Sequence, residues 1–285
     1  MSRILIAGCG YVGVAAADLF QAAGWEVEGW THSAESAAKL AGKPYPVSAV
    51  DIAVRESVEA TASRFDAVIH CASSGGGDVE SYRRIYLEGT RNLFTVLRPE
   101  TFLYTSSTSV YAQTNGEWID EESPAEPAHE TGRILRETEE SVRRNGGMVA
   151  RLAGIYGPGR SALLRKFLAG EARIEEGGMR YLNQAHRDDI AAALLHLVTT
   201  PDESQIFNVV DHEPRTQRET YEWLAAKLDR PLPPTVPRAG MRKRGASNKR
   251  VSNRKLRALG WEAKFPTFEA GMEKSVLPAY PTLGA

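Results

Sequence analysis

The stretch Arg3-Ile4-Leu5-Ile6-Ala7-Gly8-Cys9-Gly10-Tyr11-Val12-Gly13 decides the fold of this chain. Its apolar run at residues 4–7 predicts a buried strand, and the small residues at 12–23 predict a helix directly after the glycines. Glycines let the backbone turn sharply and approach a pyrophosphate, which the amides at the helix N-terminus would bind. We therefore expect a dinucleotide on Gly8, Gly10, Tyr11, Val12 and Gly13. A purely structural glycine turn is the alternative.

Strand and helix patterns then alternate through the first half of the chain. Strands are expected at 26–30, 47–50, 66–71 and 101–105, with helices at 34–40, 53–63 and 79–97 between them. This alternation calls for a parallel sheet with helices on both faces. The expected fold is a doubly wound, Rossmann-like α/β sheet with a small C-terminal α/β lobe for the substrate.

The regular alternation of strands and helices ends beyond this point. Helices are expected at 129–144, 162–168, 188–198 and 217–228, strands at 148–152 and 206–210, and a turn-rich loop at 154–159. We place a soft boundary at residue 155. Residues 1–155 would form the NAD(P)-binding core, and residues 156–285 a substrate-binding lobe interleaved with it.

The composition is ordinary for a globular protein. Of the 285 residues 42% are hydrophobic and 25% charged, and the net charge of −1 gives no reason to expect nucleic acid or a membrane as partner. Without an apolar run near 20 residues or a signal-peptide pattern, a soluble cytoplasmic protein is expected. The spacing of Cys9 and Cys71 indicates no metal site, so both are expected to be buried free thiols, with a redox role as the alternative.

The end of the second expected strand bears on which dinucleotide is bound. An acid there would hydrogen-bond the ribose 2′-hydroxyl of NAD and repel the 2′-phosphate of NADP. The chain has Thr31, His32 and Ser33 instead, whose hydroxyl and imidazole groups suit a phosphate. We therefore favour NADP over NAD; the alternative is that these are solvated loop residues. Asp51 and Ile52, after the third strand, are expected beside the adenine.

Later segments, taken with the glycine turn, resemble a known family. They are Val68-Ile69-His70-Cys71-Ala72, Leu87-Glu88-Gly89-Thr90-Arg91-Asn92-Leu93, Ser106-Ser107-Thr108-Ser109-Val110-Tyr111, residues 151–159, residues 186–191 and Phe207-Asn208-Val209. In this order the chain is similar to the extended or atypical short-chain dehydrogenase/reductase superfamily, the NAD-dependent epimerase/dehydratase-like proteins. Ala7, in place of a first glycine, and the ending at 248–256 resemble the atypical branch. The resemblance implies that Cys71, Ala72 and Ser73 also contact the cofactor.

The catalytic pattern of that superfamily is incomplete here. In the family a Ser or Thr polarises the substrate oxygen, a Tyr transfers the proton and a Lys lowers the pKa of that Tyr. Ser107, three residues before Val110, stands at the hydroxyl position, unless it only caps local backbone. Aligned on Glu137, His129 and Arg133 take the Tyr and Lys positions on one helix face. His129 would exchange a proton and Arg133 would hold ribose or phosphate; loss of this chemistry is the alternative.

Tyr86 is a second candidate for the missing hydroxyl. It stands where the resemblance implies an Asn, on the helix beside the active crevice, and simple packing is the alternative. His186 and Asp189 begin a helix, where capping competes with support of the substrate lobe. The dense basic stretch, residues 238–257, is expected to be a solvated, mobile surface segment, or else a flap that closes on a phosphate.

Two hypotheses of function follow. The first is an NAD(P)-dependent oxidoreductase or epimerase/dehydratase-like enzyme, acting on a carbonyl or hydroxyl group of a small molecule such as a nucleotide-linked sugar. The rival is a non-catalytic NADP-binding sensor or scaffold, because fold resemblance alone does not decide function. The resemblance also implies a homodimer through the helices near 79–97 and 129–145.

Overall fold

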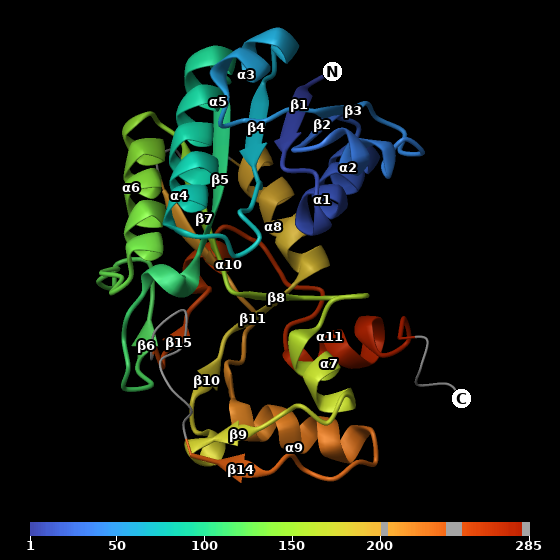
Figure 1. Ribbon diagram of the computed structural model, residues 1–285, viewed down its shortest axis with the longest axis vertical. Coiled ribbons are helices and arrows are strands. Elements are labelled where there is room, and N and C mark those ends of the chain that lie inside the picture. The colour runs from blue at the N-terminus through green and yellow to red at the C-terminus, as the bar shows by residue number, and fades with distance from the viewer. Residues whose placement is uncertain (201–204, 238–246, 281–285) are drawn as a thin grey trace.

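Seven parallel strands form the central sheet of the computed structural model, which describes residues 1–200, 205–237 and 247–280 (Figure 1). Their order across the sheet is β12-β7-β5-β4-β1-β2-β3. The strands are β1 (Arg3–Ala7), β2 (Glu26–Thr31), β3 (Val47–Ala49), β4 (Ala67–His70), β5 (Thr101–Ser107), β7 (Met148–Leu152) and β12 (Ile206–Val209). β4, β7 and β12 are buried along their whole length, as strands covered on both faces are. The predicted doubly wound α/β fold is confirmed.

Two groups of helices flank this sheet. The elements are α1 (Tyr11–Ala22), α2 (Ala34–Ala38), α3 (Arg55–Thr61), α5 (Gly89–Leu97), α6 (Glu130–Arg144) and α8 (Arg187–Thr199). α1 packs along α8, whereas α3 and α6 pack with the helix that contains α5. The strand order reverses between β1 and β4, and in such sheets a ligand crevice opens at the carboxyl ends of the strands there.

The edge strand β12 comes from the second half of the chain. It pairs in parallel with β7, with Phe207 opposite Ala150. The helix before it, α8, packs on α1 at the start of the chain. The chain therefore returns to the sheet after residue 155, so that core and lobe alternate along the sequence.

The prediction of a loop at 154–159 is wrong in its first half. Gly154–Tyr156 forms β8, which pairs in parallel with β11 (Gln184–His186). The glycines indicated a turn, but the backbone groups of this segment find partners on a strand about thirty residues away. The turn itself is short and is closed by a bridge between Gly157 and Arg160.

The helix predicted at 79–97 is continuous but not uniform. It begins as α4 (Val79–Tyr82), where the Asp78 carboxylate accepts a hydrogen bond from the Ser81 amide. Residues 83–88 then form a π-helical segment before α5 begins. Such segments are frequent at functional sites, because the extra residue per turn re-aims the side chains.

A separate small core organises the C-terminal lobe, which lies below the sheet in Figure 1. It is formed by α7 (Ala162–Leu168), α9 (Gln217–Lys227) and α11 (Phe268–Gly271), with β9 (Ile174–Glu175) paired to β14 (Thr235–Val236) and β10 (Tyr181–Leu182) to β13 (Arg215–Thr216). A capping box of Thr216 and Glu219 begins α9. No helix in the described ranges is long and apolar enough to cross a membrane.

A buried ion pair ties α6 to the sheet. The Glu139 carboxylate is fully buried and accepts hydrogen bonds from the Arg151 guanidinium at 2.7 and 3.0 Å. It also accepts one from the Ser106 hydroxyl at 2.6 Å. Arg151 in turn donates to the Tyr111 hydroxyl at 2.7 Å. The Glu139–Arg151 ion pair thus holds Ser106 and Tyr111, which lie on either side of Ser107, in place.

Removal of one partner from this pair is expected to be costly. Arg151→Met would leave the buried Glu139 carboxylate with Arg136 and Ser106 alone, so we expect a loss of about 3 to 5 kcal/mol in the free energy of unfolding by urea. The double variant Glu139→Leu with Arg151→Met should lose less, because it leaves no buried unpaired charge. Equal losses in the two proteins would contradict this account.

Candidate cofactor and reaction site

Two glycines of the first turn are required by packing, and one leaves open space. A side chain on Gly8, whose φ is +105°, would collide with the backbone of Ala72 at the end of β4. One on Gly13 would collide with the Gly8 carbonyl. By contrast, no atom lies within 4 Å of a Cβ on Gly10. The turn is therefore held against β4 while its outer side stays accessible, which fits the close approach of a pyrophosphate.

A cavity of about 290 Å³ lies beside this turn. Its walls come from the ends of β1 and β2, the segments after β3 and β4, and the helix that follows β4. They are formed by Gly8, Trp30, Thr31, His32, Val50, Ile52, Ala72, Ser73, Ser74, Ser81, Arg84 and Ile85. Six of these were predicted cofactor residues. Arg84 was missed by the sequence reasoning, although its spacing of three from Ser81 on a helix could have indicated a shared face.

The polar residues after β2 differ in what they offer a ligand. The Thr31 hydroxyl donates to the Ser33 carbonyl at 3.2 Å, and the Ser33 hydroxyl caps α2 by accepting from the Ser36 amide. His32 is exposed and lines the cavity. Local hydrogen bonds therefore occupy the two hydroxyls, and His32 is the group left facing a ligand.

Asp51 and Ile52 face in different directions. Ile52 lines the cavity, as expected for a residue beside adenine, whereas Asp51 is not among the lining residues. The Asp51 carboxylate binds the Arg84 guanidinium at 3.0 Å and accepts from the Ala53 amide at 3.0 Å. It also lies 3.9 Å from the His32 imidazole. Asp51 thus lies outside the cavity and close to two basic side chains that line it.

Tyr11 links the glycine turn to the second half of the chain. Its hydroxyl donates to the Pro158 carbonyl at 3.0 Å. The guanidinium groups of Arg160 and Arg187 lie 5.2 and 5.1 Å from its ring centre. Two cations thereby stand near the N-terminus of α1, where the helix dipole also favours an anion.

The two cysteines are free thiols in a setting that disfavours the thiolate. Burial, with the nearby Asp18 carboxylate, raises the pKa of Cys9 to about 11. Burial also raises the pKa of Cys71, which is half-exposed as a residue. A thiol that stays protonated is a poor nucleophile, so the structure supports free thiols over a redox role. Cys9 is buried as predicted, whereas Cys71 is only partly buried.

Ser107 ends β5 at the carboxyl edge of the sheet. Its hydroxyl oxygen accepts a hydrogen bond from the Ser109 amide at 3.2 Å and so begins the short helical turn of residues 108–110. The local capping role is therefore real. Since the oxygen only accepts in that bond, the hydroxyl proton stays free for another partner.

His129 and Arg133 both lie on the outside of the molecule. His129 is the exposed residue before α6, with φ −105° and ψ 148°, so the argument from a shared helix face does not hold for it. Arg133 is exposed and bonded to the Glu130 carboxylate at 3.2 Å and the Ala128 carbonyl at 3.4 Å. Within the described ranges no hydrogen bond joins either side chain to Ser107.

The resemblance was aligned on Glu137, and the nearby Glu139 is an alternative anchor. The Glu137 side chain is 54% exposed, whereas that of Glu139 is completely buried. Alignment on the buried acid moves the Tyr and Lys positions to Thr131 and Leu135, neither of which titrates. A shift of two residues turns a helix by about 200°, so the two alignments select opposite faces.

Tyr86 lies against a predicted cofactor residue. It belongs to the π-helical segment and is 9% exposed. Its hydroxyl is 3.4 Å from the Ser73 hydroxyl and 3.4 Å from the Ser74 amide, and its ring packs on Tyr82 at 5.0 Å. Among the predicted reaction residues it is the one placed beside the cavity wall.

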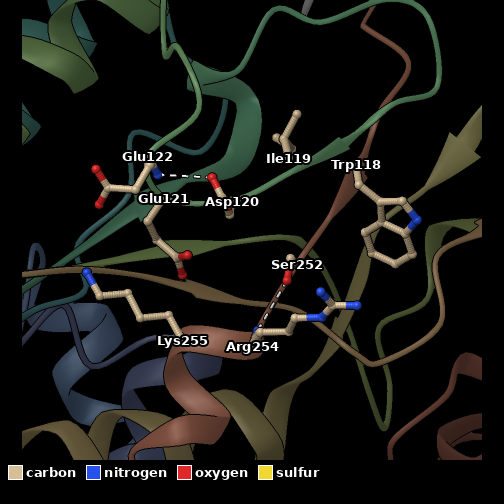
Figure 2. Close-up of a pocket in the computed structure, with 8 residues that line it drawn as sticks. All are labelled: Trp118, Ile119, Asp120, Glu121, Glu122, Ser252, Arg254 and Lys255. Atoms are coloured by element: carbon tan, nitrogen blue, oxygen red, sulfur yellow. Dashed lines mark hydrogen bonds between the residues drawn. The ribbon is translucent and has the colours of Figure 1, made fainter.

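A larger cavity, about 360 Å³, lies elsewhere, and none of the predicted site residues lines it (Figure 2). It is bounded by Trp118 at one end and by acidic residues and Lys255 at the other. Glu121 accepts a hydrogen bond from the Asn208 amide at 2.7 Å, and Lys255 donates to Gln205 at 2.7 Å. These side chains cover the outer edge of β12, which is a structural role.

The predicted surface character of the basic stretch is wrong for Lys249. Residues 238–246 lie outside the described ranges, but Lys249 is only 5% exposed and donates to the Tyr111 carbonyl at 2.7 Å. Arg250 is also held, with its guanidinium 5.2 Å from the Trp118 ring and 4.9 Å from the Tyr181 ring. Its strand β15 (Arg250–Val251) pairs with β6 (Trp118–Ile119), and sequence periodicity gives no signal for so short a pairing.

His186 and Asp189 have the capping and packing roles that were one of the two alternatives. The His186 imidazole accepts from the Asp188 amide at the start of α8. Asp189 accepts from the amides of Lys264 and Phe265 and so anchors the C-terminal segment. No cluster of His, Cys, Asp or Glu in the described part of the chain could hold a metal ion.

Comparison with known proteins identifies the family. The model of the NAD dependent epimerase/dehydratase family matches residues 4–210, from the glycine turn to β12. The chain belongs to this family. Protein YeeZ of Escherichia coli K12 is 27% identical over 226 residues, 73% of this chain and 77% of that protein. A putative NAD-dependent epimerase/dehydratase from Methylobacillus flagellatus is 26% identical, with a TM-score of 0.78 over 98% of both chains.

More distant solved structures share the fold. The human epimerase family protein SDR39U1 with NADPH is 19% identical and has a TM-score of 0.78, over 95% of this chain and 98% of that one. UDP-glucose 4-epimerase of Thermotoga maritima with UDP-glucose is 19% identical and has a TM-score of 0.79, over 95% and 96%. The family match confirms a nicotinamide dinucleotide as the type of cofactor.

The buried Lys249 gives a testable pH dependence. Burial, followed by the nearby Arg180 charge, lowers the pKa of Lys249 from 10.5 to about 8. Between these two values the unfolded chain binds the extra proton, so the free energy of unfolding should rise with pH, by about 3 kcal/mol in all. Cys9 and Cys71 contribute the opposite slope above pH 9, so the Lys249 contribution is read as the difference between two proteins. We expect the free energy of unfolding of wild type, relative to that of Lys249→Met, to rise by this amount between pH 7 and 10.5, and the difference between wild type and Lys255→Met to stay constant. Parallel pH curves for wild type and Lys249→Met would rule the account out.

Proposed function

We propose that this protein is an NADP(H)-dependent oxidoreductase or epimerase/dehydratase-like enzyme, acting on a carbonyl or hydroxyl carbon of a nucleotide-linked sugar or a similar phosphorylated molecule. The observation that carries the proposal is the cavity at the carboxyl edge of the sheet. Residues far apart in sequence, such as Gly8, His32 and Ser73, line it together. Open clefts at this edge of a doubly wound sheet are where dinucleotides bind.

The residues around the glycine turn fit a dinucleotide. A Cβ at Gly8 or Gly13 would fill the space that the turn needs, and the outer side of Gly10 is open. Arg160 and Arg187, stacked on Tyr11, would add positive charge beside a diphosphate. The cofactor supplies the hydride exchange when bound; the chain supplies orientation, and the exchange of a proton. NADP is favoured because the residues after β2 include a basic His32 and no acid.

Ser107 is the proposed orienting group for the substrate oxygen. Its hydroxyl proton is free to be donated, because its oxygen only accepts from the Ser109 amide. Tyr86 is the proposed proton-carrying group, since it is buried and bonded to Ser73 beside the cavity. The exposure of His129 lends that residue less support in this role.

The substrate class rests on chemistry and on the neighbours. The Thermotoga maritima epimerase was solved with UDP-glucose, and MoeE5 with UDP-glucose and NAD. A phosphorylated substrate would also suit the exposed guanidinium of Arg160, which forms no ion pair with the residues that the structure describes. We therefore place sugar nucleotides first among the substrates to be tried.

A non-catalytic NADP-binding sensor or scaffold is the second candidate. The observation that favours it is the exposure of His129 and Arg133, the residues predicted at the Tyr and Lys positions. Neither forms a hydrogen bond with Ser107 among the described residues, so neither is placed to exchange a proton beside it. Such a protein would bind the cofactor and change conformation without turnover.

The deciding experiment is a titration of the purified protein with NADPH and NADH by calorimetry, followed by incubation with a panel of sugar nucleotides. Nicotinamide absorbance reports net redox change, and chromatography of the products reports epimerisation. We expect tighter binding of NADPH and turnover of at least one substrate. Failure to bind either dinucleotide would remove the proposal, and binding without turnover on the whole panel would favour the sensor.

Substitution of the reaction residues should separate turnover from binding. We expect Ser107→Ala to lower turnover by at least about a hundredfold, because substrate orientation and proton transfer depend on positioned hydroxyls. NADPH affinity should not change. Tyr86→Phe should act likewise, whereas Ser109→Ala, which keeps the capping amide, should be nearly neutral. Full activity of both Ser107→Ala and Tyr86→Phe would exclude this assignment of roles.

A further inference from the structure

We propose that Arg84, together with His32, binds the 2′-phosphate of NADP, and that Asp51 behind them limits the strength of that binding. The proposal rests on the cofactor part of the proposed function. It adds a specificity-determining residue on the helix that follows β4, where the sequence reasoning placed none.

Arg84 lines the cofactor cavity together with the end of β2. It lies in the π-helical segment 83–88, and the same helix contributes Ser81 and Ile85 to the cavity wall. That wall also includes Thr31 and His32 at the end of β2. A ligand in this cavity therefore has both a guanidinium and an imidazole within reach.

One carboxylate holds both basic groups from outside the cavity. Asp51 binds Arg84 at 3.0 Å and lies 3.9 Å from His32, and it is not itself a lining residue. The side chains of Arg84 and His32 remain 46% and 72% exposed, so each can reach a ligand. The Arg84 guanidinium has five N–H donors, of which the bond to Asp51 uses one.

These features suit a phosphate better than a hydroxyl. A guanidinium binds phosphate oxygens through two parallel hydrogen bonds, and an adjacent imidazole adds a second donor. No acidic residue lines this cavity among the residues that the structure describes, so nothing on its walls repels a dianion. NAD, with a neutral 2′-hydroxyl, would gain little from the same groups. Arg84 therefore discriminates between the two cofactors rather than binding both.

Asp51 opposes this binding while it orients the cations. Its negative charge partly cancels that of Arg84, and the charge acts at short range in a partly buried setting. Arg84 bonds to Oδ2 of Asp51 and the Ala53 amide to Oδ1, so Asp51→Asn removes the charge and its one carbonyl oxygen can accept from only one of the two. The substitution should strengthen phosphate binding because it frees the Arg84 guanidinium from a competing negative charge.

The test compares three ligands by isothermal titration calorimetry: NADPH, NADH and adenosine 2′-monophosphate. We expect Arg84→Met to lower the affinities for NADPH and adenosine 2′-monophosphate by about tenfold to a hundredfold, because a charged hydrogen-bonding partner is lost. NADH affinity should stay within about twofold of wild type. Asp51→Asn should increase the affinity for the two ligands that carry a 2′-phosphate, and it should leave the affinity for NADH unchanged.

Arg83→Met is the matched control. Arg83 is the preceding residue of the same π-helical segment, but it pairs with Glu130 and Glu137 and does not line the cavity. Its substitution removes the same charge from the helix and should leave all three affinities unchanged. Thermal unfolding of each variant shows whether the fold is kept.

The possible failures can be told apart. Equal weakening of NADPH and NADH by Arg84→Met would overturn the inference, because Arg84 would then only shape the cavity. Unchanged affinities, or equal effects of Arg83→Met, would overturn it too while the proposed function stands. A wild-type protein that binds neither dinucleotide would remove the proposed function and this inference together.

Discussion

The close approach of Gly8 to the backbone of Ala72 is the constraint on which the cofactor cavity depends. The turn after β1 has no room for a side chain there, and its φ of +105° is a conformation that glycine alone adopts easily. Gly13 extends the same constraint, because it lets α1 settle on the Gly8 carbonyl. The first helix therefore begins at the point where the strand order reverses. The ends of β2 and β4 are held on either side of it, and the cavity is the space that these elements leave.

The long strands were predictable from the sequence, because each is an apolar run that must be buried between helices. The short pairings were not. β8 has three residues, and its strand form depends on β11, which no local pattern near Gly154 can reveal. The same holds for Lys249, which has the composition of a surface residue but is buried by its pairing segment and by a bond to Tyr111. The strand form of β8 and the burial of Lys249 depend on tertiary partners and not on local propensity.

Six residues of the cavity wall were predicted from the sequence, whereas the proton carrier stays a prediction, for a physical reason. Glycines and strand ends carry backbone constraints that can be recognised in one dimension. The position of a proton carrier depends on which face of α6 looks inward, and burial of Glu139 and exposure of Glu137 show that face only in three dimensions. Anchors two residues apart select opposite faces and so different candidates. Arg84 was missed because no residue of its helix was assigned to the cofactor, so the spacing of Ser81 and Arg84 was not used.

The distribution of charge divides this site into two parts. The adenosine side has Arg84 and His32 around one carboxylate, and the glycine turn has Arg160 and Arg187 stacked on Tyr11. Around Ser107 and Tyr86, by contrast, the chain offers hydroxyls. Charged groups bind phosphates strongly whatever the reaction, whereas hydroxyls orient an oxygen or move a proton only if the substrate is correctly placed. In the proposed site, the charged groups that would hold the phosphates are therefore separate from the hydroxyls that would do the chemistry.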